Sequence, residues 1–160
     1  MKNLKKITVA EAYNLDKTPS WIAAPDDEFT DVVRRFAEEP DLRGIFVAEE
    51  DCHLIGVITR RDLLDWARIQ IGASFYTSEE YWLKEDVRLF ELMRASKAQE
   101  VARPDSASSA VHVNDSLSEA LRKMLVHDLS CLPVVDEDNI IIGDLKLSEI
   151  LLQALNSTED

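Results

Sequence analysis

The sequence predicts a mixed α/β (α+β) fold: two copies of one β-α-β-β-α unit packed through their sheets, with a helical connector. The first observation is a repeat, because residues 27–36 (DEFTDVVRRF) match residues 115–124 (DSLSEALRKM) in acidic, apolar and basic positions. The second is that each copy continues through an apolar segment and an acidic turn to a glycine, Gly56 or Gly143. Since 160 residues suit two small halves of one module, we expect pseudo-twofold symmetry.

The repeat also predicts the domain boundaries. We assign residues 8–71 to the first motif, residues 72–95 to the connector and residues 96–158 to the second motif, with a one-residue deletion between helix and strand. Possible helix-capping boxes stand near the start of each copy: Thr8 with Glu11, and Ser96 with Gln99.

The first helix of each copy has apolar residues at helical spacing, typical of an amphipathic helix that packs on a sheet. These residues are Phe29, Val32, Val33 and Phe36 in the first copy, and Leu117, Ala120, Leu121, Met124 and Leu125 in the second. An extended segment precedes each of these helices, at residues 19–23 and 109–113.

A predicted β-hairpin and a closing helix complete each copy. The strands cover residues 44–48 and 54–58 in the first copy, and 131–135 and 140–145 in the second. The closing helices are marked by Leu63, Trp66 and Ala67, and by Leu147, Ile150, Leu151, Ala154 and Leu155.

The connector has no counterpart in the repeat. A capping box at residues 77–80 predicts a helix through residues 81–93 that packs across the two halves. Residues 103–109 (RPDSASS) are rich in serine and contain a proline, so we expect a loop there.

Composition excludes several classes of function. Lys plus Arg number 18 against 31 Asp plus Glu, and a net charge of -13 argues against nucleic-acid or anionic membrane binding. Cys52 and Cys131 form no CxxC motif, so a reduced protein is expected. The N-terminus lacks the apolar core of a signal peptide, and no apolar run reaches membrane-spanning length, which predicts a cytoplasmic protein.

Two segments resemble the CBS motif. They are residues 46–63, which contain the string LIGVITRRDL, and residues 132–143, which begin LPVVDED. The resemblance implies a pair of motifs, called a Bateman module, and further pairing of modules into a disc-like homodimer. It also implies an adenine nucleotide (AMP, ADP or ATP) as regulatory ligand in the cleft between motifs, with S-adenosylmethionine or a metal ion as alternatives.

The first copy contains the complete nucleotide signature that the resemblance implies, Gly56-Val57-Ile58-Thr59-Arg60-Arg61-Asp62. The N-terminus of the helix that begins there suits a phosphate, because its N–H groups are unpaired and its dipole end is positive. Thr59 is expected to donate to phosphate or sugar, and Asp62 to accept from ribose hydroxyls. Arg60 and Arg61 supply paired positive charge there, and the resemblance places one of them near the phosphates, with Arg60 assigned to the site. Thr-x-x-Asp is also an ordinary capping box, and these residues can both cap the helix and bind a ligand.

The adenine is expected between a strand and the extended segment that precedes the first helix. We expect Ile45, Phe46 and Val47 to form one wall, and Thr18 and Trp21 the other. Phe46 departs from the family pattern, in which proline is usual.

The second copy departs from the signature and predicts a degenerate site. Lys146 stands in place of the threonine and Glu149 in place of the aspartate. Lys146 is expected to be a solvated surface lysine. His112 and Pro133 would line this second cleft.

No nucleophile elbow, HExxH motif, EF-hand loop or P-loop is present in the sequence, so we predict no catalytic residues and no enzyme activity. The favoured function is a stand-alone ligand sensor that signals to an unidentified regulated protein. The alternative is a ligand-free dimerisation or protein-interaction module.

Overall fold

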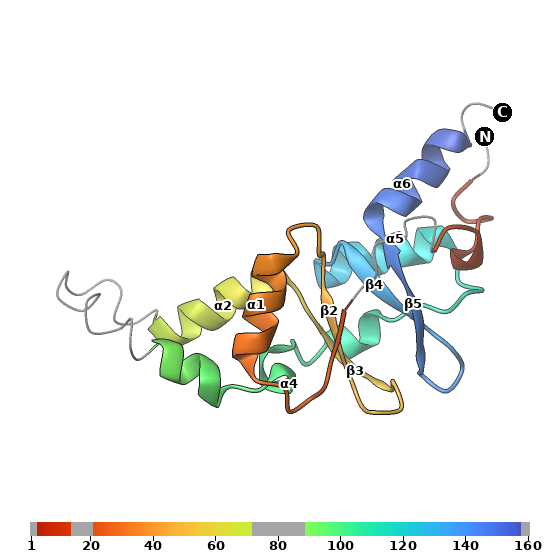
Figure 1. The fold of residues 1–160 in the computed structure, drawn as a ribbon. Coiled ribbons are helices and arrows are strands. Elements are labelled where there is room, and N and C mark those ends of the chain that lie inside the picture. The colour runs from red at the N-terminus through yellow and green to blue at the C-terminus, as the bar shows by residue number, and fades with distance from the viewer. Residues whose placement is uncertain (1–2, 14–20, 72–88, 158–160) are drawn as a thin grey trace.

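The computed structural model describes residues 3–13, 21–71 and 89–157. The first copy has the predicted order of elements (Figure 1). They are β1 (Trp21–Ala23), α1 (Phe29–Glu38), β2 (Ile45–Ala48), β3 (Leu54–Ile58) and α2 (Arg60–Ile71).

The second copy repeats the helix, hairpin and closing helix but not the leading strand. Its elements are α5 (Leu117–His127), β4 (Cys131–Val135), β5 (Ile141–Lys146) and α6 (Leu147–Asn156). The extended segment before α5 contributes only a parallel bridge, between Val111 and Val134. The loop predicted for residues 103–109 is wrong in part, because Ser106–Ser109 form a 3-10 helix, η2, that follows the short helix α4 (Ala98–Val101).

The two sheets have matching irregularities. β1, β2 and β3 form one sheet with β1 parallel to β2, and β4 and β5 form an antiparallel pair. The register shifts after Val47 in one hairpin and after Val134 in the other, at equivalent positions of the repeat. The turns are also equivalent, since Cys52 (φ 65°) and Asn139 (φ 64°) both adopt the left-handed conformation.

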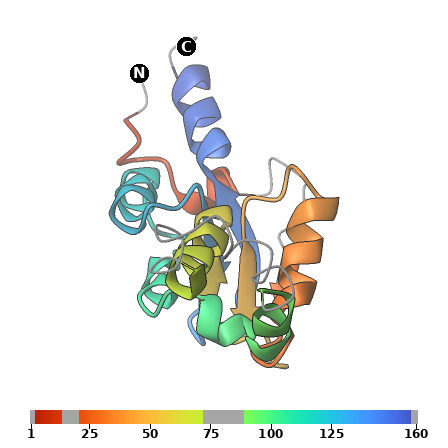
Figure 2. The same ribbon diagram turned by 90° about the vertical axis from the view of Figure 1, so that its left-hand side faces the viewer.

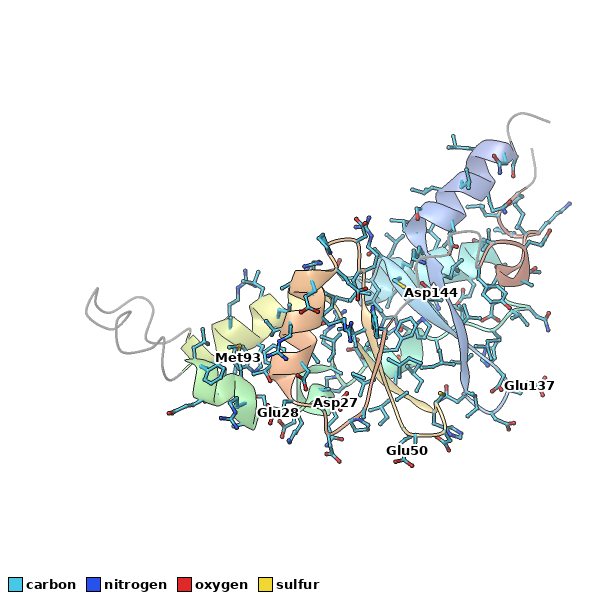
Figure 3. All side chains as sticks on the ribbon, in the orientation of Figure 1. Asp27, Glu28, Glu50, Met93, Glu137 and Asp144 are labelled. Atoms are coloured by element: carbon cyan, nitrogen blue, oxygen red, sulfur yellow. The ribbon has the colours of Figure 1, made fainter. Side chains whose placement is uncertain are left out.

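The hairpins join at their turns. The Leu54 amide donates to the Asn139 carbonyl (3.2 Å), and the Ile141 amide donates to the Cys52 carbonyl (3.0 Å). Both turns carry acidic residues, and Glu50 and Glu137 lie toward the same end of the molecule (Figure 3). Predicted packing of the sheets is confirmed by one hydrophobic cluster that contains Phe46 and Val57 of the first motif with many residues of the second.

The leading segment of each copy packs against the first helix of the other copy. The Val9 amide donates to the Asp115 carbonyl (2.8 Å), ahead of α5. The Ala98 amide donates to the Asp27 carbonyl (2.9 Å), ahead of α1. Val9 and Ala98 are fully buried in these exchanged positions. The packing units therefore differ from the contiguous repeats read along the sequence.

The capping boxes in the structure agree only in part with those predicted from the sequence. Glu11 accepts from the Thr8 amide (2.8 Å), which confirms the first capping box. The box predicted at Ser96 and Gln99 is displaced by one residue, because the Glu100 carboxylate accepts from the Lys97 amide (2.7 Å). The Ser96 carbonyl instead accepts from the Phe29 amide, and the Ser96 hydroxyl donates to the Leu92 carbonyl.

Residues 89–95 are helical, in agreement with the last part of the predicted connector helix, whereas its capping box lies outside the described residues. Viewed from the side, α6 extends away from the rest of the molecule (Figure 2). Within the described ranges, no helix is both long and apolar enough to cross a lipid bilayer.

Candidate ligand-binding cleft

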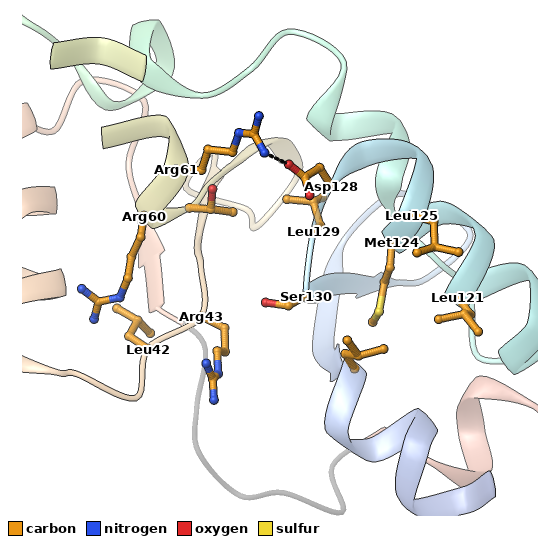
Figure 4. Close-up of a pocket in the computed structure, with 12 residues that line it drawn as sticks. Leu42, Arg43, Arg60, Arg61, Leu121, Met124, Leu125, Asp128, Leu129 and Ser130 are labelled. Atoms are coloured by element: carbon orange, nitrogen blue, oxygen red, sulfur yellow. Dashed lines mark hydrogen bonds and ion pairs between the residues drawn. The ribbon is translucent and has the colours of Figure 1, made fainter. Parts of the chain in front are cut away.

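A cleft of about 450 Å³ lies between the two motifs (Figure 4). Its lining includes pairs of residues at equivalent places in the two copies, such as Leu42 with Leu129 and Arg43 with Ser130. The cleft therefore straddles the pseudo-twofold axis. The described residues that line it are Leu42, Arg43, Thr59, Arg60, Arg61, Leu121, Met124, Leu125, Asp128, Leu129, Ser130 and Leu147.

The predicted signature loop lies at one wall of this cleft. β3 ends at Ile58 and α2 begins at Arg60, so Thr59 is the residue before the helix. Asp62 Oδ2 accepts from the Thr59 amide (2.6 Å) and from its hydroxyl (2.9 Å). The capping box is thus formed, and Thr59 also lines the cleft.

The second carboxylate oxygen of Asp62 faces another partner. Asp62 Oδ1 lies 3.1 Å from Nε of Arg103, in an ion pair whose Asp62 side chain is only 2% exposed. Neither of these two atoms completes a hydrogen bond. Asp62 is therefore buried behind the cleft wall, with one oxygen that retains an unused acceptor position.

Arg60 reaches the cleft, but its guanidinium binds the end of α1. Its Nη2 donates to the carbonyls of Phe36 (2.9 Å), Glu39 (3.1 Å) and Pro40 (3.1 Å). The guanidinium also lies 5.2 Å from the centre of the Phe36 ring. A cation at a helix C-terminus is stabilising, so Arg60 stabilises the end of α1.

Arg61 and Arg43 provide the other positive charges of the cleft. Arg61 forms an ion pair with Asp128 of the second motif, drawn as a dashed line in Figure 4. Arg43 is exposed and makes no hydrogen bond or ion pair with any described residue. Arg43 is not among the residues predicted from the sequence, although its position next to the start of a repeated strand was a usable signal.

The acidic turns lie at the far end of the hairpins from these arginines. Arg43 precedes β2 and Thr59 follows β3, whereas Glu49, Glu50 and Asp51 connect the two strands at the other end. A five-residue strand is about 16 Å long, which exceeds the Debye length of about 8 Å in physiological salt. The cleft is therefore locally basic in an acidic chain.

Among the described residues, those predicted to hold adenine do not line this cleft. Ile45, Phe46 and Val47 are at most 2% exposed and belong to the core. Trp21 is half-buried beside a separate small cavity, with the Arg35 guanidinium 3.5 Å from its ring centre. Thr18 lies outside the described residues.

The sequence matches the CBS domain family twice, over residues 12–68 and 99–155. The chain belongs to the CBS domain family. Solved CBS structures share its fold along nearly the whole length. A CBS domain-containing protein from Thermotoga maritima has 26% identity and a TM-score of 0.72, and the alignment covers 94% of this chain and 95% of that one.

Two further CBS structures were solved with nucleotides. CBSX2 in complex with AMP has 21% identity and a TM-score of 0.67, with 95% and 98% coverage. The CBS domain of the bacterial CNNM/CorC family Mg²⁺ transporter in complex with ATP has 18% identity and a TM-score of 0.63, with 95% and 89% coverage. No curated protein matches the sequence closely enough to identify a relative.

The second CBS motif replaces its signature with a buried ion pair. Lys146 Nζ lies 2.8 Å from Asp144, and the two side chains are 7% and 9% exposed. Lys146 is therefore not the surface lysine expected from sequence. Burial by itself would lower the pKa of the Lys146 ammonium, but the hydrogen bond and charge of Asp144 outweigh burial and raise that pKa.

The other predicted residues of the second site are not gathered in the cleft described above. Glu149 is buried and accepts from the Lys146 amide (2.8 Å), as Asp62 does from Thr59 in the first motif. Pro133 is buried within β4, and His112 has a half-exposed side chain. Among the described residues, no group of three His, Cys, Asp or Glu side chains is placed to hold a metal ion.

Proposed function

We propose that this CBS pair is a non-catalytic regulatory module that binds one adenine nucleotide in the cleft between its motifs. The observation that carries the proposal is Arg43: a guanidinium without a described partner, in a cleft next to a helix N-terminus, in a chain of net charge -13. Support comes from the shared fold of CBS structures in complex with AMP and with ATP.

The cleft offers distinct chemistry for each part of a nucleotide. Arg43 would bind phosphate oxygens through its forked donors, and the Thr59 hydroxyl would bind phosphate or sugar. Leu42, Met124 and Leu129 would pack against the base, since such sites combine apolar walls with a few polar groups. The second motif would not hold a nucleotide because Asp144 already neutralises Lys146.

Isothermal titration calorimetry with ATP, AMP and S-adenosylmethionine tests the proposal. We expect a single site per chain for an adenine nucleotide, and about tenfold weaker binding in Arg43→Gln, because a hydrogen bond to a charged group is lost. Arg34→Gln is the matched control, since Arg34 is an exposed arginine of α1 that pairs with Asp31 away from the cleft. Recovery of the nucleotide unchanged would agree with a non-catalytic role.

Two results would contradict the proposal. Equal affinity of Arg43→Gln and wild type would place the nucleotide elsewhere. No heat with any of these ligands or with Mg²⁺ would favour the alternative, a ligand-free interaction module.

We also propose that two copies of the chain pair through their closing helices. Leu64 in α2 and Leu151 in α6 occupy equivalent positions, and each is 51% exposed. α6 exposes Leu152 and Leu155 as well. Exposed leucines that recur on both motifs suit a symmetric partner, because a twofold interface uses the same surface of each copy.

A further inference from the structure

Arg61 and Asp62 are consecutive residues at the start of α2, and each forms an ion pair with a residue in the second half of the chain. α2 supplies the cation of one pair and the anion of the other. Arg61 binds Asp128, which follows α5, and both residues line the cleft (Figure 4). Asp62 binds Arg103, which follows α4, behind the cleft wall. The first turn of α2 is therefore connected to the second half by one pair inside the cleft and one pair outside it.

The two ion pairs differ in burial. The Arg61 and Asp128 side chains are 61% and 59% exposed, whereas the Asp62 side chain is only 2% exposed. An exposed pair contributes little stability and exchanges partners easily, while breaking a buried pair leaves a charge without compensation. The exposed pair can therefore open while the buried pair keeps α2 attached.

The backbone fixes Asp128 at the edge of the cleft. Asp128 ends α5 in the left-handed conformation (φ 54°, ψ 49°), and its amide donates to the Met124 carbonyl. Its carboxylate neutralises Arg61 and adds a negative charge to the cleft that an anionic ligand must meet.

We infer that a phosphorylated ligand takes Arg61 from Asp128, so that binding opens the exposed ion pair between the two motifs. This inference rests on the proposed nucleotide site and adds its regulation. Asp128 competes with the ligand for one guanidinium, and the outcome of that competition changes a contact between the motifs. Ligand occupancy is thereby converted into altered packing of the CBS pair.

Asp128→Asn tests the competition. Asparagine has the same shape and tolerates the left-handed conformation, but it cannot form the ion pair. We expect ATP and inorganic tripolyphosphate to bind about two- to fivefold more tightly by calorimetry, which is the value of an exposed ion pair. Asp65→Asn is the control, because it removes the same charge and an exposed pair with Arg68 in α2, outside the cleft.

The double variant Asp128→Asn with Arg61→Gln distinguishes competition for Arg61 from simple repulsion between Asp128 and the ligand. If Asp128→Asn acts by freeing Arg61, its gain in affinity must disappear in the background of Arg61→Gln. A gain that persists in the double variant, or that appears equally in Asp65→Asn, would overturn the inference. So would ATP binding with the same affinity to wild type and Asp128→Asn, which would leave the proposed function intact. No ATP binding by any of these proteins would overturn both.

Discussion

Asp62 shows how one side chain serves local structure and a longer-range contact at once. One oxygen caps α2 through Thr59, and the other faces Arg103 at 3.1 Å. A nucleotide that recruits Asp62 must compete with both partners or use the acceptor position that remains on Oδ1. Loss of ligand binding after substitution of Asp62 would therefore not locate a ligand by itself, and Arg43 provides the cleaner test.

We expect Asp62→Ala to lower the free energy of unfolding by about 2–4 kcal/mol, because it removes a cap and leaves Arg103 without its counterion. Urea unfolding followed by circular dichroism measures this change. Asp65→Ala, at a partly exposed position three residues further along α2, should stay within about 0.5 kcal/mol of wild type. An Asp62→Ala protein as stable as wild type would show that neither contact matters to folding.

At the scale of elements, β3 packs against the segment that follows the connector. The Val57 amide donates to the buried Ser106 hydroxyl (2.8 Å). A Cβ atom on Gly56 would lie 3.0 Å from both Ser106 Oγ and Ala102 Cβ. The glycine shared by both copies of the repeat is thus needed in the first motif for close approach, since no glycine of the described chain has a positive φ.

Gly56→Ala should therefore lower the free energy of unfolding by about 1–3 kcal/mol, the usual cost of overpacking. Gly44 offers a matched control next to β2, because a Cβ there would meet Ile58 O and Val57 Cγ1 at 3.5 Å, an ordinary contact. Thermal unfolding of both variants measures the difference. Equal stability of Gly56→Ala and Gly44→Ala would show that η2 adjusts to admit the methyl group.

At the scale of the whole molecule, the two CBS motifs are bound together by exchange of their leading segments, by the paired hairpin turns and by a shared core. These contacts make the pair a single unit, and the cleft lies between its two motifs. A change at the cleft edge, such as the opening of Arg61–Asp128, can alter the packing of the motifs and hence the relative position of α2 and α6.

Size-exclusion chromatography with light scattering tests the proposed pairing of two copies. We expect wild type at twice the 18.1 kDa chain mass. The double substitution Leu64→Glu with Leu151→Glu should give monomers, because it places charges in an apolar interface. Ile142→Glu is the control, since Ile142 is 44% exposed on β5 rather than on a closing helix. A double variant that remains dimeric would move the interface to another surface.

Sequence alone determined the repeat, the helices and hairpins of both CBS motifs and the position of Thr59 between strand and helix. These features follow from local patterns: apolar residues at helical spacing, short apolar strands around an acidic turn, and a threonine between strand and helix. Even there, the second capping box was wrong by one residue, because Glu100 rather than Gln99 supplies the acceptor.

Tertiary structure decided which charges pair and which remain available. Arg60 looked suited to phosphate, but it binds the end of α1, whereas Arg43 has no described partner. Lys146 looked solvated, but it is buried and paired with Asp144. Partners such as Asp62 and Arg103 are far apart in sequence, and ion-pair distances depend on how the motifs pack. Local patterns carry no information about that packing, so the chemistry of the cleft had to come from the fold.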